Sequence, residues 1–189
     1  TLHTLFPYTT LFRSFATVGS LANALEESFA PYMEAFAPFL YNALTNQEEP
    51  ALCSMAIGLV SDVTRSMGAQ CEPYCDTFMN YLLNNLRVCL DLFGLIYIST
   101  DISQSTALAN QFKPAILQCF GDIAGAIGGA FEKYLSVVAQ VLQQAATVQA
   151  SPEGSYEMYD YVMSLREGIM DAWGGIIGAM KSSEQCEYY

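Results

Sequence analysis

Residues with metal-binding or nucleophilic side chains are few in this chain, and they follow helical spacing. Cys71 and Cys75 are four positions apart, so on a helix both thiols share one face, where they could bind a soft metal ion such as Zn²⁺. A zinc site needs about four ligands, and neither a histidine nor a second cysteine pair lies nearby. The cysteines at positions 53, 71, 75, 89, 119 and 186 occur inside apolar helical patterns. They predict buried thiols of a reducing compartment, without a metal centre or a disulfide framework.

Asp62 and Asp122 are the two carboxylates whose placement could suggest acid–base chemistry. They occupy equivalent places near the ends of two predicted helices and recur with the repeat described below, which favours a structural role at the ~10 Å spacing of packed helices. His3 is the only histidine, no nucleophile lies beside a base, and the glycine run at 124–130 (AGAIGGA) lacks the strand that precedes a phosphate-binding loop. We therefore predict that the protein is not an enzyme and has no catalytic residue, metal or cofactor.

Polar side chains that could recognise a partner recur on the second helix of three helix pairs. In the middle pair Asp76, Asn80 and Asn84 are four apart and turn away from an apolar stripe on the same helix. Stacked pairs would align such stripes into a polar ladder, where carboxylates pair with Lys or Arg and amides bond the backbone of a docked peptide. From the residues alone, a plain solvated helix face is the alternative. The candidate partner-binding residues are Glu34, Asn42, Asp76, Asn80, Asn84, Gln140 and Gln144, and Pro38 and Ser136 complete the equivalent positions.

The elements that position this ladder repeat at a regular interval. In each pair an aromatic residue opens the second helix, an apolar residue follows four places on, and a leucine four places after that. Tyr32 and Tyr74, which open the first two of these stripes, are 42 positions apart, within the ~40–47 residues of a two-helix HEAT or armadillo unit. The three stripes are Tyr32, Phe36 and Leu40, then Tyr74, Phe78 and Leu82, then Tyr134, Val138 and Leu142. The sequence therefore predicts an all-α solenoid of antiparallel helix pairs.

A segment without a counterpart separates the second and third units. Tyr74 and Tyr134 are 60 positions apart, and removing the 17 residues 88–104 (VCLDLFGLIYISTDISQ) restores an interval of 43. Its codons can begin with GT and end with CAG, so we hypothesise a retained short intron; a natural loop insertion between helices remains the alternative. Equal lengths of genomic and spliced copies would rule out the intron.

Both ends of the chain depart from the repeat. Residues 4–14 (TLFPYTTLFRS) match the translation of a common sequencing-library adapter and show no helical or strand period, so we expect 1–14 to be an unstructured artefact. Repeat units then occupy 15–87 and 105–183 on either side of the 88–104 insertion, and a tail at 184–189 no longer follows the pattern. Neither end resembles a polar capping unit, so we expect an internal fragment of a longer protein.

Periodicity together with proline and glycine positions predicts the helices. They cover 16–25, 29–45, 51–67, 72–87, a helix from Phe112 or Lys113 to 127, 131–148 and 156–181. Gly68 is expected to close the third of these in the left-handed conformation. Glycines within a helix cost ~1 kcal/mol each relative to alanine, so their presence in the last helix predicts close approach to a neighbouring helix. Those glycines are Gly168, Gly174, Gly175 and Gly178.

The charge balance restricts the class of partner. A formal net charge of −12 argues against nucleic acid, whose binders need a basic patch, and favours basic partners. No uninterrupted apolar run reaches the ~18 residues of a membrane span, and the nearest, 92–98, is short, so membrane insertion is not expected.

Three runs of the sequence resemble one family. They are AIGLVSDVTRSMGAQCEPYCDTFMNYLLNNL at 56–86, FKPAILQCFGDIAGAIGGAFEKYL at 112–135 and YDYVMSLREGIMDAWGGIIGAM at 159–180. They are similar to the later HEAT repeats of the importin-β (karyopherin-β) family of nuclear import receptors, with fungal members as the expected source. The resemblance covers 15–87 and 105–183; the insertion, the first residues and the tail depart from it.

The resemblance implies a function without chemistry. It implies a curved superhelix with first helices on the convex face and second helices on the concave face. The concave face would bind importin-α or basic nuclear localisation signals, outer slots would bind phenylalanine-glycine nucleoporins, and Ran-GTP would release cargo. The protein would then occur in the cytoplasm, in the nucleus and at the pore in the nuclear envelope. The alternative is a structural HEAT-repeat scaffold, such as a phosphatase regulatory subunit, which shares the period and the acidity.

Overall fold

The described part of the chain is helical. The structure, a computed structural model, describes residues 6–46, 49–96, 103–150 and 156–181, and no strand occurs among them. The helices are α1 (Phe6–Leu25), α2 (Ala30–Leu44), α3 (Pro50–Met67), α4 (Glu72–Ile96), α5 (Ser103–Ile127), α6 (Glu132–Ala146) and α7 (Tyr156–Lys181). This confirms the predicted all-α class.

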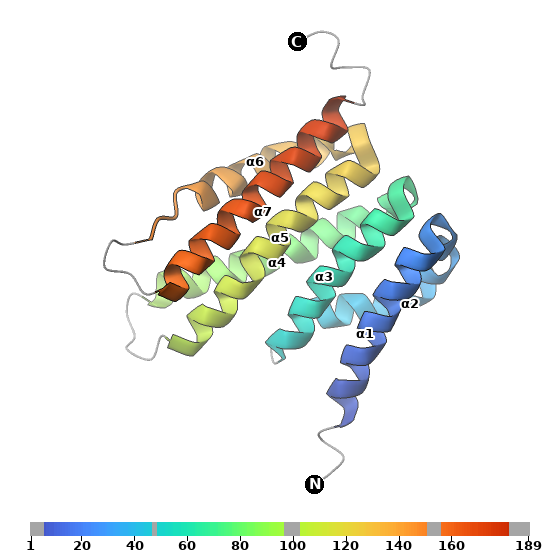
Figure 1. Ribbon diagram of the computed structural model, residues 1–189, viewed down its shortest axis with the longest axis horizontal. Helices are drawn as coiled ribbons and strands as arrows, with labels where there is room; N and C mark the ends of the chain where they lie inside the picture. The colour runs from blue at the N-terminus through green and yellow to red at the C-terminus, as the bar shows by residue number, and fades with distance from the viewer. Residues whose placement is uncertain (1–5, 47–48, 97–102, 151–155, 182–189) are drawn as a thin grey trace.

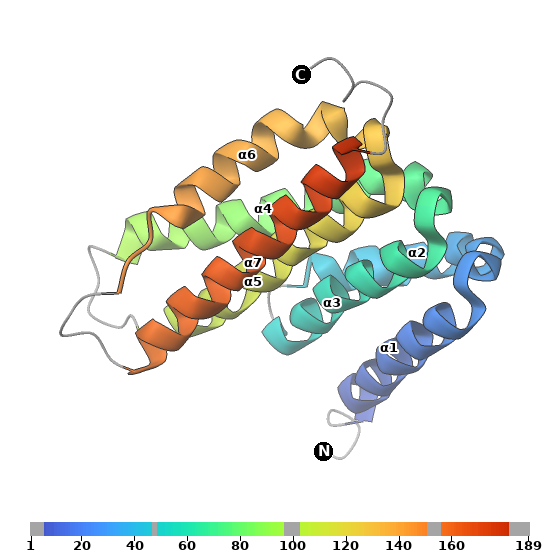
Figure 2. The ribbon, with the colours of Figure 1, turned by 45° about the horizontal axis from the view of Figure 1, so that its top comes forward.

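The helices form two layers of a stacked array. Figure 1 shows α1, α3, α5 and α7 side by side, which we call the A layer, and Figure 2 shows α2, α4 and α6 on the other side of them, which we call the B layer. In the A layer α1 packs on α3, α3 on α5, and α5 on α7. In the chain α1, α3 and α5 are each followed by a B helix, so successive pairs stack as the repeat predicts.

A short 3₁₀ turn joins the two helices of each pair. The turns are Glu26–Phe29, Gly68–Cys71 and Gly128–Phe131. Their first residues have positive φ, 49°, 54° and 56°, and are separated by the intervals that separate the three tyrosines. The φ of Gly68 is positive, as expected for the residue that ends the helix. Its ψ of −135° places it outside the left-handed helical region that we predicted. Glycine adopts this backbone freely, whereas a glutamate at the same place is strained.

Two expected boundaries around the 88–104 segment are wrong. Helix α4 continues to Ile96 instead of ending near 87, and α5 begins at Ser103 instead of at Phe112 or Lys113, which leaves Pro114 inside the helix. The described residues of the segment therefore extend both helices, and 97–102 lie outside the described residues. The prediction failed because the segment was treated as foreign, although its 88–96 part contains no proline to stop a helix. Its origin stays a hypothesis.

The expected lack of structure in residues 1–14 is also wrong from Phe6 onward. Helix α1 runs through this stretch to Leu25, and Phe15, the residue after the stretch, is buried and packs edge-on against Phe36 of α2, in the same helix pair. Nucleation orders three residues for one hydrogen bond, whereas each residue added to an existing helix gains one bond for the one residue that it orders, so a weakly periodic segment can extend a helix. The adapter origin of these residues is not tested by their conformation.

The core is continuous across the stacked pairs. From the B helices Leu40, Phe78, Leu82, Val138 and Leu142 are fully buried, and from the A helices Ile57, Val60, Phe120 and Ile123 are. Of the tyrosines in the repeat, Tyr134 is 9 % exposed and Tyr74 half-buried, but Tyr32 is 59 % exposed. The later tyrosines pack toward the preceding B helix, and no described B helix precedes α2, so the first tyrosine faces solvent.

The thiols and the most apolar stretch also belong to this core. Cys53, Cys71, Cys75 and Cys119 are buried free thiols, as predicted, while the side chains at 89 and 186 lie outside the described set. One described stretch, Phe112–Ala146, has by length and composition alone the apolarity of a membrane span. It contains the turn between α5 and α6, and half of its most apolar window is buried inside the fold, which is typical of core helices.

Candidate functional site

The predicted polar ladder lies on the B layer, and all of its members are exposed. Each helix of that layer contributes one stripe at four-residue spacing, so the side chains project from the same layer of three consecutive units. The exposed residues are Glu34, Pro38 and Asn42 on α2, Asp76, Asn80 and Asn84 on α4, and Ser136, Gln140 and Gln144 on α6. The structure thus presents the set to solvent, and its role in binding stays a prediction.

The carboxylate of Asp76 already has partners in the next unit. Lys133 on α6 places its Nζ 2.9 Å from Asp76 Oδ1, and the Tyr134 hydroxyl donates a hydrogen bond to the same oxygen. Lys133 Nζ also lies 4.9 Å from the centroid of the Tyr134 ring. These two contacts join α4 to α6 on the exposed side of the B layer. The sequence analysis missed both partners.

These contacts shift the protonation equilibria of all three groups. The hydrogen bond from Tyr134, followed by the bond from Lys133, lowers the pKa of Asp76. Burial, and then the bond to the carboxylate, raises the pKa of the Tyr134 hydroxyl to about 12. The same carboxylate raises the pKa of Lys133. At neutral pH the group is therefore an ionised pair held by a neutral phenol.

Glu34 occupies the register position of Asp76 one unit earlier but has different surroundings. The residue equivalent to Lys133 in the middle unit is Pro73, which offers no charge. Among the described residues no side chain bonds to the Glu34 carboxylate, which is exposed on α2. A signal for the difference was present in the sequence, because a lysine at this register occurs in the third unit and prolines in the first two.

Asn85, beside the predicted Asn84, is the amide that serves the fold. Its Nδ2 donates to Leu44 O at 2.9 Å and to Tyr81 O at 3.0 Å, and its Oδ1 accepts a weak bond from Cys53 Sγ at 3.7 Å. It satisfies a carbonyl at the carboxyl end of α2 and so ties α2 to α4. The apolar stripe carried a signal for this, because Asn85 follows Leu82 by three positions and Phe78 by seven, which puts it on the core side of α4, where it is half-buried.

The A-layer carboxylates that could have suggested catalysis have separate environments. Asp62 forms an ion pair with Arg65, whose Nη2 lies 2.7 Å from its Oδ1. Asp122 Oδ2 is buried without a hydrogen-bond partner among the described residues, and burial raises the pKa of its carboxyl. The Ser61 hydroxyl lies close enough to Asp122 to oppose this shift, and Ser61 Oγ is itself 3.1 Å from the buried Cys119 Sγ. The structural role expected from the recurrence of the two carboxylates stays a prediction.

The cysteine pair has the proximity that its spacing predicts. The Sγ atoms of Cys71 and Cys75 are 3.5 Å apart in the core, and the hydrogen bond between them lowers the pKa of Cys71 and raises that of Cys75. Within the described ranges, no group of three or more His, Cys, Asp or Glu side chains is placed to hold a metal ion. The pair is a packed dithiol of the core.

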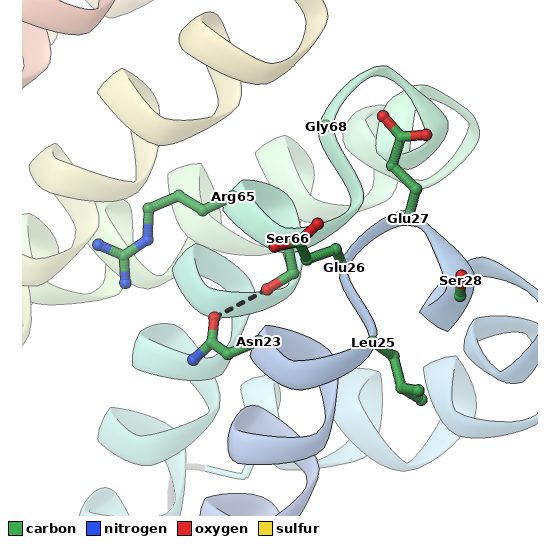
Figure 3. Close-up of a pocket in the computed structure, with 8 residues that line it drawn as sticks. All are labelled: Asn23, Leu25, Glu26, Glu27, Ser28, Arg65, Ser66 and Gly68. Carbon is green, nitrogen blue, oxygen red and sulfur yellow. Dashed lines mark hydrogen bonds between the residues drawn. The ribbon is translucent and has the colours of Figure 1, made fainter.

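A polar hollow lies at the corner where the first two pairs meet. Figure 3 shows it between the end of α1 and the end of α3, with Ser66 Oγ donating to Asn23 Oδ1 at 2.8 Å and with Arg65 and Glu27 extending to opposite sides. Its volume is about 700 Å³, and it is lined by Asn23, Leu25, Glu26, Glu27, Ser28, Arg65, Ser66 and Gly68. Most of these side chains are exposed, so the hollow is a surface feature away from the polar ladder.

A family model and related sequences all indicate the same protein family. The family model described as importin subunit beta-1-like, TPR repeats, matches residues 9–91 and 94–188. Importin subunit beta-1 of Schizosaccharomyces pombe is 44 % identical over 170 residues, and that of Arabidopsis thaliana 37 % over 171. Each alignment covers 90 % of this chain and 18 % of the relative, so the chain spans less than a fifth of the length of these relatives.

Solved structures agree with the helical array. A crystal structure of importin beta in an ammonium sulfate condition is 70 % identical, with a TM-score of 0.78 over 92 % of this chain and 18 % of that one. A Kap95:Nup1 complex is 27 % identical, with a TM-score of 0.73 over 99 % and 20 % of the two chains. A third structure describes how Kap95p binding induces the switch loops of RanGDP to adopt the GTP-bound conformation. Its matching chain is 26 % identical, with a TM-score of 0.74 over 96 % of this chain and 19 % of that one.

Proposed function

The chain belongs to the importin subunit beta-1 family, and from that premise we propose that it is a segment of a nuclear import receptor whose B layer binds basic protein segments. The basic ligand would be importin-α or a basic nuclear localisation signal. The family membership favours a nuclear import receptor over a structural HEAT-repeat scaffold such as a phosphatase regulatory subunit. We propose no catalytic role. Fungal origin remains a prediction.

The observation that supports the proposal most is the solvent exposure of the complete polar ladder. Side-chain amides at Asn80, Asn84, Gln140 and Gln144 form no hydrogen bond with other described residues, and the Glu34 carboxylate is likewise open. An extended basic peptide needs such an arrangement, because amides can bond its backbone while carboxylates pair with its cations. The net charge of −12 adds a favourable field for approach of a basic segment.

Ran-GTP and phenylalanine-glycine nucleoporins complete the proposed partners. The Kap95 structures contain RanGDP and Nup1, and we extend partners of that kind to this chain by its family. On the A layer Ile57 and Phe120 are fully buried and Trp173 is half-buried, so these side chains belong to the core. The exposed large apolar side chains of the A layer are Leu21 on α1 and six residues of α7, namely Tyr156, Tyr159, Met163, Met170, Ile177 and Met180. We place the receptor in the cytoplasm, in the nucleus and at the nuclear envelope.

A titration with a fluorescent Lys/Arg-rich peptide tests the proposed surface. Glu34→Gln is expected to weaken binding about two- to fivefold, because an exposed ion pair contributes up to ~1 kcal/mol. Glu157→Gln removes the same charge from an exposed position on α7 and is expected to change the affinity little. Equal losses from both variants, or no binding by the wild-type chain, would exclude the B layer as the site.

A further inference from the structure

The Asp76 carboxylate is the member of the polar ladder that is already engaged with a cation of its own chain. We propose that Lys133 is a specificity-determining residue of the B layer: its ammonium occupies Asp76 in place of a partner's lysine or arginine, so a basic segment pairs there only by displacing it. This inference rests on the proposed function, since it concerns how that surface selects its ligand.

The two groups that hold Asp76 differ in how easily they can leave. Tyr134 is 9 % exposed, and its ring packs edge-on against Phe131 with centroids 5.6 Å apart, so its hydroxyl is fixed by the core. The Lys133 side chain is 48 % exposed and the Asp76 side chain 68 %. A flexible exposed lysine can swing into water, while the phenol keeps the carboxylate in place for an incoming cation.

Replacing Lys133 by a partner cation changes the free energy little, and for this reason the surface can select among basic segments. Displacing Lys133 by a partner cation breaks one exposed ion pair and forms another, so a ligand gains little from Asp76 alone. At Glu34 no described cation has to be displaced, because Pro73 stands where the third unit has its lysine. The ladder therefore contains one open carboxylate and one compensated carboxylate in adjacent units, and it favours segments that also engage the amides around them.

Binding of a Lys/Arg-rich peptide by four variants provides the test. Lys133→Met keeps an unbranched stem over the Tyr134 ring and removes the ammonium, so we expect the Kd to fall about two- to fivefold. The gain should vanish in the Lys133→Met/Asp76→Asn double variant, and Asp76→Asn alone completes the cycle. The matched control is Lys181→Met at the end of α7, which removes the same charge from the A layer and should leave the affinity unchanged.

Several outcomes would overturn the inference. A gain from Lys181→Met equal to that from Lys133→Met, or a gain that persists without Asp76, would show a general charge effect. Equal peptide affinity of wild type and Lys133→Met would overturn the inference alone, whereas loss of binding in every variant would overturn the proposed function with it. An NMR titration of the Asp76 carboxyl in the peptide-free chain gives a separate readout: its pKa should rise in Lys133→Met, and an unchanged value would refute the ion pair.

Discussion

Replacing Gly175 by alanine should push α5 and α7 apart, although the same change normally stabilises a helix. A Cβ at Gly175 would lie 2.3 Å from Gly121 O and 2.7 Å from Gly121 Cα, which are backbone atoms that cannot rotate away. The seam continues along both helices, where a Cβ at Gly121 would lie 2.7 Å from Asp171 O and one at Gly168 would lie 2.8 Å from Pro114 O. Two helices thus approach each other backbone to backbone.

The expected magnitude follows from two opposing terms. Alanine gains ~1 kcal/mol over glycine in a helix interior, while overpacking a close interface costs about 1–3 kcal/mol and more against backbone. The difference is a fall of up to about 2 kcal/mol in the free energy of unfolding of Gly175→Ala, and more because the contacted atoms are backbone. Gly178 is the matched control, because a Cβ there meets nothing within 4 Å, and its alanine variant should be more stable by about 0.5–1 kcal/mol.

Thermal unfolding followed by circular dichroism measures both changes in the 189-residue chain. For a chain of this size each kcal/mol moves Tm by about 2–4 °C, so the two variants should differ from wild type in opposite directions. A Gly175→Ala variant as stable as Gly178→Ala would refute the close contact of α5 with α7.

Three further substitutions test single features of the fold. Glu26→Gly should raise stability by up to about 1 kcal/mol, because φ is 49° there, and a lower Tm would contradict the strain. Asn85→Ala should cost about 1–3 kcal/mol, because Leu44 O would keep only the weak bond from Cys53 Sγ at 3.5 Å, while Asn84→Ala, on the exposed face, should be neutral. Equal effects of the two variants would be evidence against the bond that ties α2 to α4. Burial raises the pKa of the Asp122 carboxyl in the folded chain, so the native state binds this proton more tightly than the unfolded state and loses stability as pH rises through that pKa. Asp122→Asn should therefore raise the free energy of unfolding at neutral pH, and urea titrations should show this gain shrinking toward acid pH. A gain that does not depend on pH would refute this reasoning.

Features that depend on the repeat period could be predicted from the sequence. The 42-residue interval placed Asp76 and Glu34 at equivalent positions, and both are exposed on the B layer. The same interval recurs in the turns, where Glu26 takes the positive φ that glycine takes in the later units. Period fixes which face a residue shares with its counterparts because helix geometry is the same in every unit.

Features that depend on contacts between units could not be predicted in this way. All four glycines of α7 were expected to mark a close approach, but only Gly168 and Gly175 face α5, while a Cβ at Gly174 or Gly178 meets nothing within 4 Å. Which glycine is in contact depends on where two helices cross, and periodicity does not contain the crossing point. The Asp76–Lys133 pair was missed for the same reason, because it joins residues of different units.

The two layers of the array are held together by different kinds of contact, and this difference bears on ligand binding. In the A layer the last two helices meet through glycine backbones, so their separation is fixed by hard-sphere contact. In the B layer the bonds that cross from α4 to α6 are made by side chains, Asp76 with Lys133 and Tyr134. A ligand that displaced Lys133 from Asp76 would change only a contact between side chains, which can adjust. The cation exchange that we propose for the B layer would therefore leave the close backbone contact of α5 with α7 intact.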